Sequence, residues 1–155
     1  MKRLPGVGEL KSVYRALAGL VAIGVVVQAM TIALAWFTAI KDMDDGLVID
    51  KNTDLNFGHV AHGWIGMMAI PVIALLLLIV SFFAKVQGGV RWALYVVGLV
   101  ALQIALAFVS FGTPIVGTLH GLNAFALAGV ASMAARRAVA TPAPAAAESP
   151  AEAAR

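Results

Sequence analysis

Long apolar runs separated by short polar segments set the pattern of this chain. No Asp, Glu, Lys or Arg occurs in residues 16–40, 55–84 or 92–135. A helix of about 20 apolar residues can cross a bilayer, so the third run is too long for a single crossing. Gly112 and Pro114 lie within this run and are expected to break it into two helices. The pattern predicts four membrane-spanning helices, at about residues 15–40, 58–84, 91–111 and 115–136.

Composition favours the same class of protein. The 155 residues are 61% hydrophobic and 12% charged, which is far more apolar than a soluble domain. We therefore expect an all-α fold, a bundle of four transmembrane helices. The absence of cysteine excludes disulfide exchange, a thiolate zinc site and an iron–sulfur cluster. No nucleic-acid partner is expected, because the basic residues flank the apolar runs and form no stripe with interleaved aromatic side chains.

The distribution of Lys and Arg predicts the orientation of the chain in the membrane. Loops with an excess of these residues stay on the cytoplasmic side. Segments 1–15, 85–91 and 136–137 are basic, whereas loop 41–56 is rich in Asp and holds only Lys41 and Lys51. We expect a multi-pass protein of the cell inner (cytoplasmic) membrane, with both termini in the cytoplasm.

Three regions are expected along the chain: a cytoplasmic N-terminal segment at 1–14, a transmembrane domain at 15–137 and a tail at 138–155. The tail is rich in Ala and Pro and has no large apolar residue after Val139, so we predict that it is disordered. The first apolar run can also be read as a signal peptide with a weak cleavage site at Ala33 and Ala35. It is longer than the roughly 7–15 apolar residues of a usual signal, which favours an uncleaved helix.

Similar polar residues recur in the two predicted hairpins. Gln28 and Gln103 each lie near the middle of the first helix of a hairpin, and a His-Gly pair begins the second helix. The two pairs are His62-Gly63 and His120-Gly121. The pattern indicates two repeated hairpins of the same orientation, although apolar sequences also align through composition alone. Both Gln side chains are expected to form hydrogen bonds between helices in a polar core.

The three histidines, His59, His62 and His120, are the only chemically versatile side chains near the membrane interior. Counted from the basic residue that ends each helix, the height of His120 differs by about 10 Å from that of His62 and by about 15 Å from that of His59. His59 and His62 share a helix face, so a shift of one turn would exchange them. We hypothesise that His120 with His62 or His59 ligates one haem b, for electron transfer with a quinone or a membrane oxidoreductase.

Neighbouring residues are expected to complete this cofactor site. Gly63 and Gly121 would let a flat macrocycle approach the backbone, and Asn123 would orient the imidazole of His120. Five aromatic residues are expected to line the pocket: Phe57, Trp64, Phe108, Phe111 and Phe125.

Other interpretations of these residues are open. Gly117 and Gly121 form a G-x-x-x-G pair, which more often marks close helix packing. A haem carries two propionates, whereas the Asp-rich loop offers few cations. His59, His62 and Asp54 could hold zinc or copper, without an assured further ligand. The alternative to a redox protein is a cofactor-free accessory or structural subunit of a larger membrane complex. Independent catalytic activity is not expected.

Four short motifs resemble an uncharacterised family of small bacterial four-span membrane proteins, a domain of unknown function. They are VVVQAMTIALAWF, HVAHG, LQIALAF and LHGLNAF, one in each predicted span. The resemblance covers residues 15–137, implies the four-span fold, and picks His59 and His120 as the characteristic pair, accompanied by Gln28 and Gln103. This pairing differs from that of His62 with His120, which the estimated heights favour, so the choice between His59 and His62 stays open.

The layout is also similar to cytochrome b561-like four-helix haem proteins and to one half of haem A synthase, in which paired histidines lie on facing helices. Only the second and fourth spans carry histidine in this chain, and no Arg is placed to bind propionates. This likeness therefore implies at most one haem.

Overall fold

The first helix is also the longest. The computed structural model describes residues 6–139, and α1 spans Val7–Asp44. The carboxylate of Glu9 accepts a hydrogen bond of 2.9 Å from the main-chain N–H of Gly6, which caps the start of the helix. α1 begins at Val7, ahead of the span predicted from about residue 15, because the polar segment before the apolar run continues the same helix. At the other end of α1, Lys41 forms an ion pair with Asp45.

The second span contains a wide helical turn. α2 covers Phe57–Trp64, the π-helical segment η1 covers Ile65–Ala69, and α3 covers Ile70–Ser81. The N–H of Ile70 bonds to the carbonyl of Ile65, five residues earlier. Pro71 comes next, and a proline has no N–H to donate and crowds the carbonyl of the preceding turn. The wide turn accommodates this proline while the span continues as one crossing.

The last two spans form a second hairpin. α4 covers Gly89–Gly112, the 3-10 turn η2 covers Pro114–Val116, and α5 covers Gly117–Arg137. The predicted break at Gly112 and Pro114 is confirmed, because α4 ends at the first and η2 begins at the second. In the turn between the hairpins, Lys85 and Gly88 have φ angles of 50° and 68°. Glycine adopts this left-handed conformation without strain, which suits Gly88 to the position before α4.

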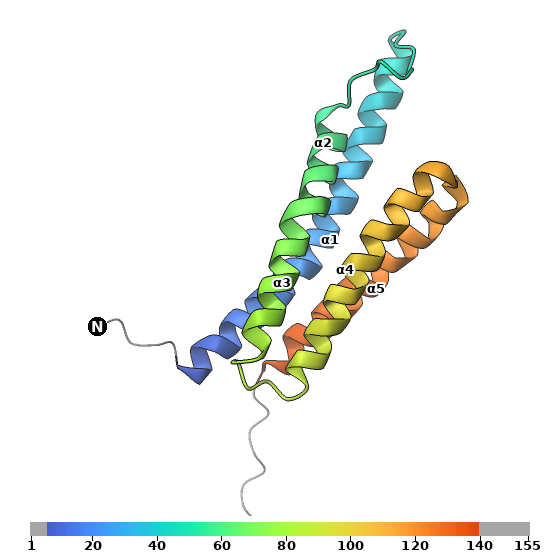
Figure 1. Ribbon diagram of the computed structural model, residues 1–155. Coiled ribbons are helices and arrows are strands. Elements are labelled where there is room, and N and C mark those ends of the chain that lie inside the picture. The colour runs from blue at the N-terminus through green and yellow to red at the C-terminus, as the bar shows by residue number, and fades with distance from the viewer. Residues whose placement is uncertain (1–5, 140–155) are drawn as a thin grey trace, which may run out of the picture.

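The two hairpins lie side by side, and the α1–α2 hairpin extends beyond the α4–α5 hairpin (Figure 1). We call the half that holds Gly6, Val139 and the 82–88 turn the terminal end, and the half that holds loop 45–56 and η2 the loop end. α1 packs against α2, α3 and α5, while α4 packs against α3 and α5.

The buried core lies toward the terminal end. Its side chains are mostly small or aliphatic, which lets the four helices approach closely. They include Ala18, Val21, Ala74, Leu77, Ala93, Val96, Leu127, Ala131 and Ala134. Tyr14 is also buried, and its hydroxyl donates a hydrogen bond of 3.0 Å to the main-chain oxygen of Gly89, which ties α1 to the start of α4.

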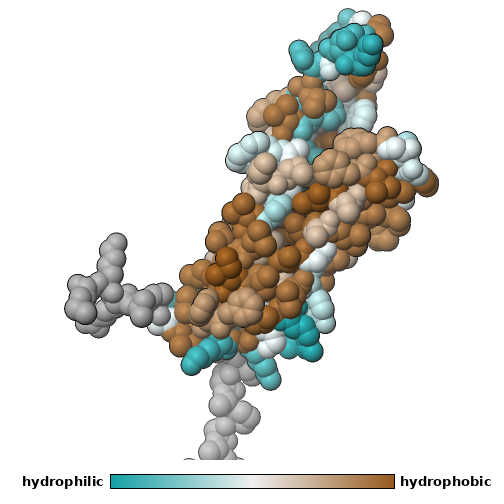
Figure 2. Space-filling view, viewed as in Figure 1, coloured by the Kyte–Doolittle hydropathy of each residue, from teal (hydrophilic) through white to brown (hydrophobic). Residues whose placement is uncertain are grey.

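The sides of the bundle are apolar. Figure 2 shows hydrophobic residues along its length and hydrophilic residues gathered mainly at the two ends. Each of the four spans is long and apolar enough to cross a membrane. Large side chains such as Phe37 and Phe111 are 73% and 84% exposed, and such a surface is favourable in lipid rather than in water. The predicted all-α, four-helix fold of an integral membrane protein is confirmed.

Candidate functional site

His62 is held against the first helix of its own hairpin. Its Nδ1 atom lies 3.0 Å from the main-chain oxygen of Gln28 on α1. A carbonyl oxygen only accepts hydrogen bonds, so Nδ1 donates and Nε2 of the neutral ring is left as an acceptor. The hydroxyl of Thr31 donates to the same oxygen at 3.0 Å. His62 thus links α2 to the middle of α1.

His120 makes a larger set of contacts in the second hairpin. Its ring Nδ1 atom lies 3.0 Å from the main-chain oxygen of Gln103. Its ring Nε2 atom lies 3.1 Å from the side-chain amide nitrogen, Nε2, of Gln103. The Gln103 amide nitrogen also donates to the main-chain oxygen of His120 at 3.0 Å. Because Nδ1 donates to a carbonyl, Nε2 of His120 accepts from the Gln103 amide. Both ring nitrogens of His120 are therefore engaged with Gln103.

Asn123 completes this network from a buried position. Its side-chain nitrogen donates to Oε1 of Gln103 at 2.6 Å and to the main-chain oxygen of Leu99 at 3.0 Å. Asn123 was expected to bond directly to the imidazole of His120. Within the described part of the chain it makes no such bond, because its amide reaches across to α4, so it positions His120 only through Gln103.

His59 belongs to the cap of α2. Its main-chain N–H and its ring Nδ1 lie 3.3 Å and 3.2 Å from the side-chain oxygen of Asn56. The amide nitrogen of Asn56 donates to the main-chain oxygen of Ala35 on α1 at 2.8 Å. The ring of Trp36 meets the imidazole of His59 edge-on, with centroids 5.5 Å apart. Asn56 therefore both caps α2 and attaches it to α1.

The two hairpins use the same kind of contact. In each hairpin, two side-chain nitrogens from the second helix, or from the residue that caps it, donate to main-chain oxygens of the first helix. The donors are Asn56, His62, His120 and Asn123, and the acceptors are Ala35, Gln28, Gln103 and Leu99. Water is scarce inside a bilayer, so such bonds hold helices together without competition from solvent. His62 and His120 occupy corresponding places in this scheme.

The two glutamines differ in how they take part. The side chain of Gln103 bonds across the hairpin as expected. The side-chain oxygen of Gln28 instead lies 3.4 Å from the hydroxyl of Thr31 on the same helix. Among residues 6–139 the Gln28 amide forms no hydrogen bond to another helix, since its main-chain oxygen takes that role. The expectation of an interhelical bond from the Gln28 side chain was therefore wrong.

Glycines on either side of His62 let α2 approach α1. A Cβ atom added at Gly58 would lie 2.5 Å from the main-chain nitrogen of Ala35, and one at Gly66 would overlap the Gln28 amide. By contrast, a Cβ atom at Gly63 or Gly121 would meet nothing within 4 Å. Close packing in the first hairpin therefore depends on Gly58, which faces backbone atoms, whereas the flexible Gln28 side chain opposite Gly66 can move aside. Gly63 and Gly121 border open space.

These contacts determine how well the histidines suit a haem iron. A ligand needs a ring nitrogen that is free to bind the metal, and Nε2 of His62 makes no hydrogen bond within the described residues. His120 would offer its Nε2 atom only after the Gln103 amide had moved away. The described geometry leaves Nε2 of His62 free to bind iron, whereas iron ligation by His120 first requires the Gln103 amide to move.

The surroundings of the histidines do not enclose a large flat group. The five aromatic residues that were expected to line a pocket are between 59% and 84% exposed. Two hollows on the surface of the described chain both lie at the terminal end, away from the histidines. Among residues 6–139, no three His, Asp or Glu side chains gather closely enough to hold a metal ion.

Sequence reasoning did not identify Asn56 and Gly58. Asn is a preferred residue before the first turn of a helix, so its place before Phe57 could have marked the cap of α2. Gly58, His62 and Gly66 recur at intervals of four residues, which places them along one helix face. That spacing was the signal for a face packed against α1.

Comparisons of this chain with protein-family models, curated proteins and solved structures found no match.

Proposed function

We propose that this protein is a cofactor-free subunit whose α1–α2 hairpin packs, at the loop end, against a helix of a larger membrane complex. The observation that carries this proposal is the position of α2. Apart from η1, which continues the same span, α2 packs closely on α1 alone among the described elements, whereas α1, α3, α4 and α5 each pack closely on at least two others. The bundle therefore leaves one hairpin without a further helix beside it at the loop end.

The side of α2 that faces away from α1 carries large, exposed apolar side chains. Phe57, Val60 and Trp64 are 76%, 53% and 66% exposed, and they present both bulky and β-branched apolar side chains. His62 lies on the opposite face of α2, with Gly58 and Gly66 toward α1, so this free side is apolar throughout.

Site-specific photo-crosslinking in intact membranes tests the proposal. A photoreactive amino acid at Val60 should give one adduct of defined mass, which mass spectrometry then identifies as a membrane protein. The matched control is the same substitution at Leu122 of α5, which is 65% exposed and should give lipid adducts only. The same adducts in the same yield at both positions would contradict a docked hairpin.

A second candidate is a b-type haem protein for one-electron transfer with a quinone or a membrane oxidoreductase. The observation that favours it is the way both imidazoles are held. His62 and His120 each donate from Nδ1 to a main-chain oxygen at 3.0 Å, and histidines that ligate metals are commonly oriented by such a bond. A bound haem would supply reversible iron oxidation, and His62 would be its ligand, joined by His120 after the Gln103 amide had rotated.

An absorption spectrum of purified protein distinguishes the two candidates. The haem candidate expects a Soret band after expression with ample haem, and expects the band to be lost in His120→Ala. The cofactor-free candidate expects no band in either protein, together with the Val60 adduct. A Soret band in the parent protein that disappears in the variant would overturn the cofactor-free assignment.

We further propose that both termini face the cytoplasm in an inner membrane. The basic residues of the described chain gather at the terminal end, and the Asp-rich loop lies at the opposite end. Because the chain has no cysteine, Asn52→Cys introduces a single thiol in that loop. A membrane-impermeant maleimide should label it in intact cells, and protection until the cells are lysed would reverse the orientation.

A further inference from the structure

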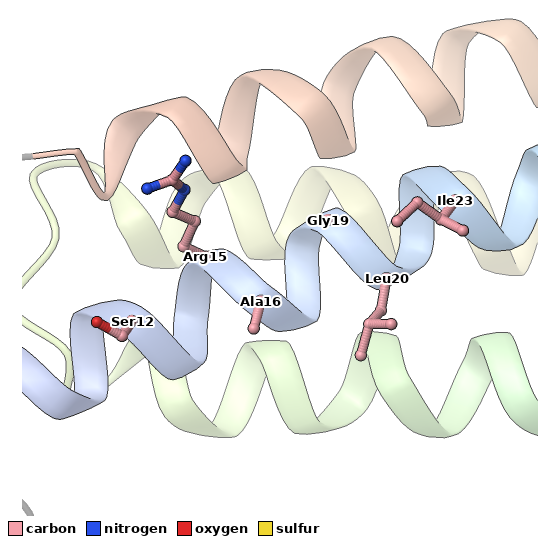
Figure 3. Close-up of a pocket in the computed structure, with 6 residues that line it drawn as sticks. All are labelled: Ser12, Arg15, Ala16, Gly19, Leu20 and Ile23. Atoms are coloured by element: carbon pink, nitrogen blue, oxygen red, sulfur yellow. The ribbon is translucent and has the colours of Figure 1, made fainter.

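A shallow groove runs along the outer face of α1 at the terminal end. It has a volume of about 480 Å³ and is lined by Ser12, Arg15, Ala16, Gly19, Leu20 and Ile23. All six residues belong to α1, and Figure 3 shows Arg15 directed from this helix toward the end of α5. The groove therefore has a polar end with Ser12 and Arg15, and an apolar lining from Ala16 to Ile23.

Positive charge gathers around the polar end of the groove. Lys11 and Arg15 lie on the first turns of α1, and Arg136 and Arg137 end α5, which packs against α1. The acidic residue in the first turn of α1, Glu9, is hydrogen-bonded to the main chain of Gly6. Within residues 6–139 the one ion pair is Lys41 with Asp45, at the loop end. Among residues 6–139, an anion at the terminal end would therefore be attracted by several cations, with Glu9 as the one carboxylate near them.

The floor of the groove has room for a hydrocarbon chain. A Cβ atom added at Gly19 would meet nothing within 4 Å, so the surface is recessed there. Leu20 and Ile23 are 47% and 61% exposed and form the apolar continuation of the groove. From Arg15 to Ile23 the helix rises about 12 Å, which places this part below the headgroup layer when Arg15 lies at the membrane surface.

We propose that an anionic phospholipid occupies this groove, with its phosphate on Arg15 and an acyl chain over Gly19, Leu20 and Ile23. A guanidinium binds a phosphate through two parallel hydrogen bonds, and basic sites at helix ends are suited to acidic lipid headgroups. A zwitterionic lipid fits the same apolar floor, but its own cation opposes Arg15. The groove thus selects the lipid by its charge and accommodates it by its shape.

Native mass spectrometry of the full-length protein tests this site. The protein is released from detergent after incubation with equal amounts of phosphatidylglycerol and phosphatidylcholine. Phosphatidylglycerol adducts should dominate, and Arg15→Gln should reduce their excess about fivefold. Arg15→Lys should retain most of the preference because it keeps the charge. Lys51→Gln, at the loop end, is the matched control and should change nothing.

Two further arms identify what fills the groove. Gly19→Leu should lower the binding of phosphatidylglycerol while leaving the protein folded, because its side chain would fill the recess. Soluble glycerol phosphate in large excess should not displace the lipid. Equal binding of the two lipids, an unchanged preference in Arg15→Gln, or complete displacement by glycerol phosphate would overturn the proposal. A dimer that excludes lipid from the parent protein would also overturn it, since a second copy would then cover this face.

Discussion

Gln103 of α4 and His120 of α5 contact each other at three points. The ring Nδ1 atom donates to the main-chain oxygen of Gln103, and the Gln103 amide nitrogen lies 3.1 Å from the ring Nε2 atom and 3.0 Å from the main-chain oxygen of His120. Each residue therefore satisfies polar groups of the other inside the apolar span. The second hairpin is closed by this pair, with Asn123 as a further support.

Replacing His120 by Ala should destabilise the second hairpin. The substitution leaves the Gln103 amide without its ring acceptor, and we expect a loss of about 1–2 kcal/mol in the free energy of unfolding. Reversible unfolding in mixed detergent micelles measures this change. Leu122→Ala is the control, because that side chain is 65% exposed and should contribute little. If both variants unfold at the same denaturant fraction as the parent, the pair does not hold the hairpin.

The fold was predictable because membrane spans follow from length and polarity alone. The break at Gly112 and Pro114 and the number of crossings were read directly from apolar runs and helix breakers. α1 begins ahead of the span predicted from about residue 15, because residues 7–14 are helical but too polar to count as membrane-spanning. Hydropathy identifies the residues that are stable in lipid, but it does not predict how far a helix continues outside the membrane.

The candidate site was only partly predictable. The choice of His62, His120, Gln103 and Asn123 as the polar residues of interest came from their rarity in apolar runs. Their hydrogen-bond partners could not be predicted in this way. Most of these partners are main-chain oxygens, which every residue has, so the sequence does not distinguish them. Depth counting compared His62 with His120, whereas each histidine bonds within its own hairpin.

A pair of glycine variants tests the packing of α2 on α1. Gly58→Ala should cost about 1–3 kcal/mol in the free energy of unfolding, because its Cβ would press on the backbone of Ala35 and Thr31 and force the helices apart. Gly63→Ala faces open space and should leave stability unchanged or raise it by up to about 1 kcal/mol. The same detergent titration compares them. Equal behaviour of the two variants would show that α2 does not approach α1 closely at Gly58.

Tyr14→Phe isolates one hydrogen bond between the hairpins. The change removes only the hydroxyl that donates to Gly89, so a loss of about 0.5–1.5 kcal/mol is expected. Tyr95→Phe serves as the control, because Tyr95 is 50% exposed and its hydroxyl makes no hydrogen bond within the described residues. A loss of similar size in both variants would mean that the hydroxyl of Tyr14 gives no specific link between α1 and α4.

The turn at Asp50 in the Asp-rich loop should depend on pH. The main-chain N–H of Asn52 donates to the Asp50 carboxylate at 2.8 Å, and this bond, with those to Thr53, holds the pKa of Asp50 below its ordinary value. A carboxyl group with a lowered pKa stabilises the folded turn above its ordinary pKa of about 3.9, and this stabilisation is lost as the pH falls through the lower value.

The amide resonance of Asn52 in micelles follows this transition. Its midpoint should lie below that of an unperturbed Asp, and Asp50→Asn should abolish the titration, because an amide side chain does not ionise. The amide resonance of Gly98, in the middle of α4, should stay constant over the same range. A midpoint at or above the ordinary value in the parent protein would mean that the carboxylate is not held by these donors, since hydrogen bonds to the charged form can only lower the pKa.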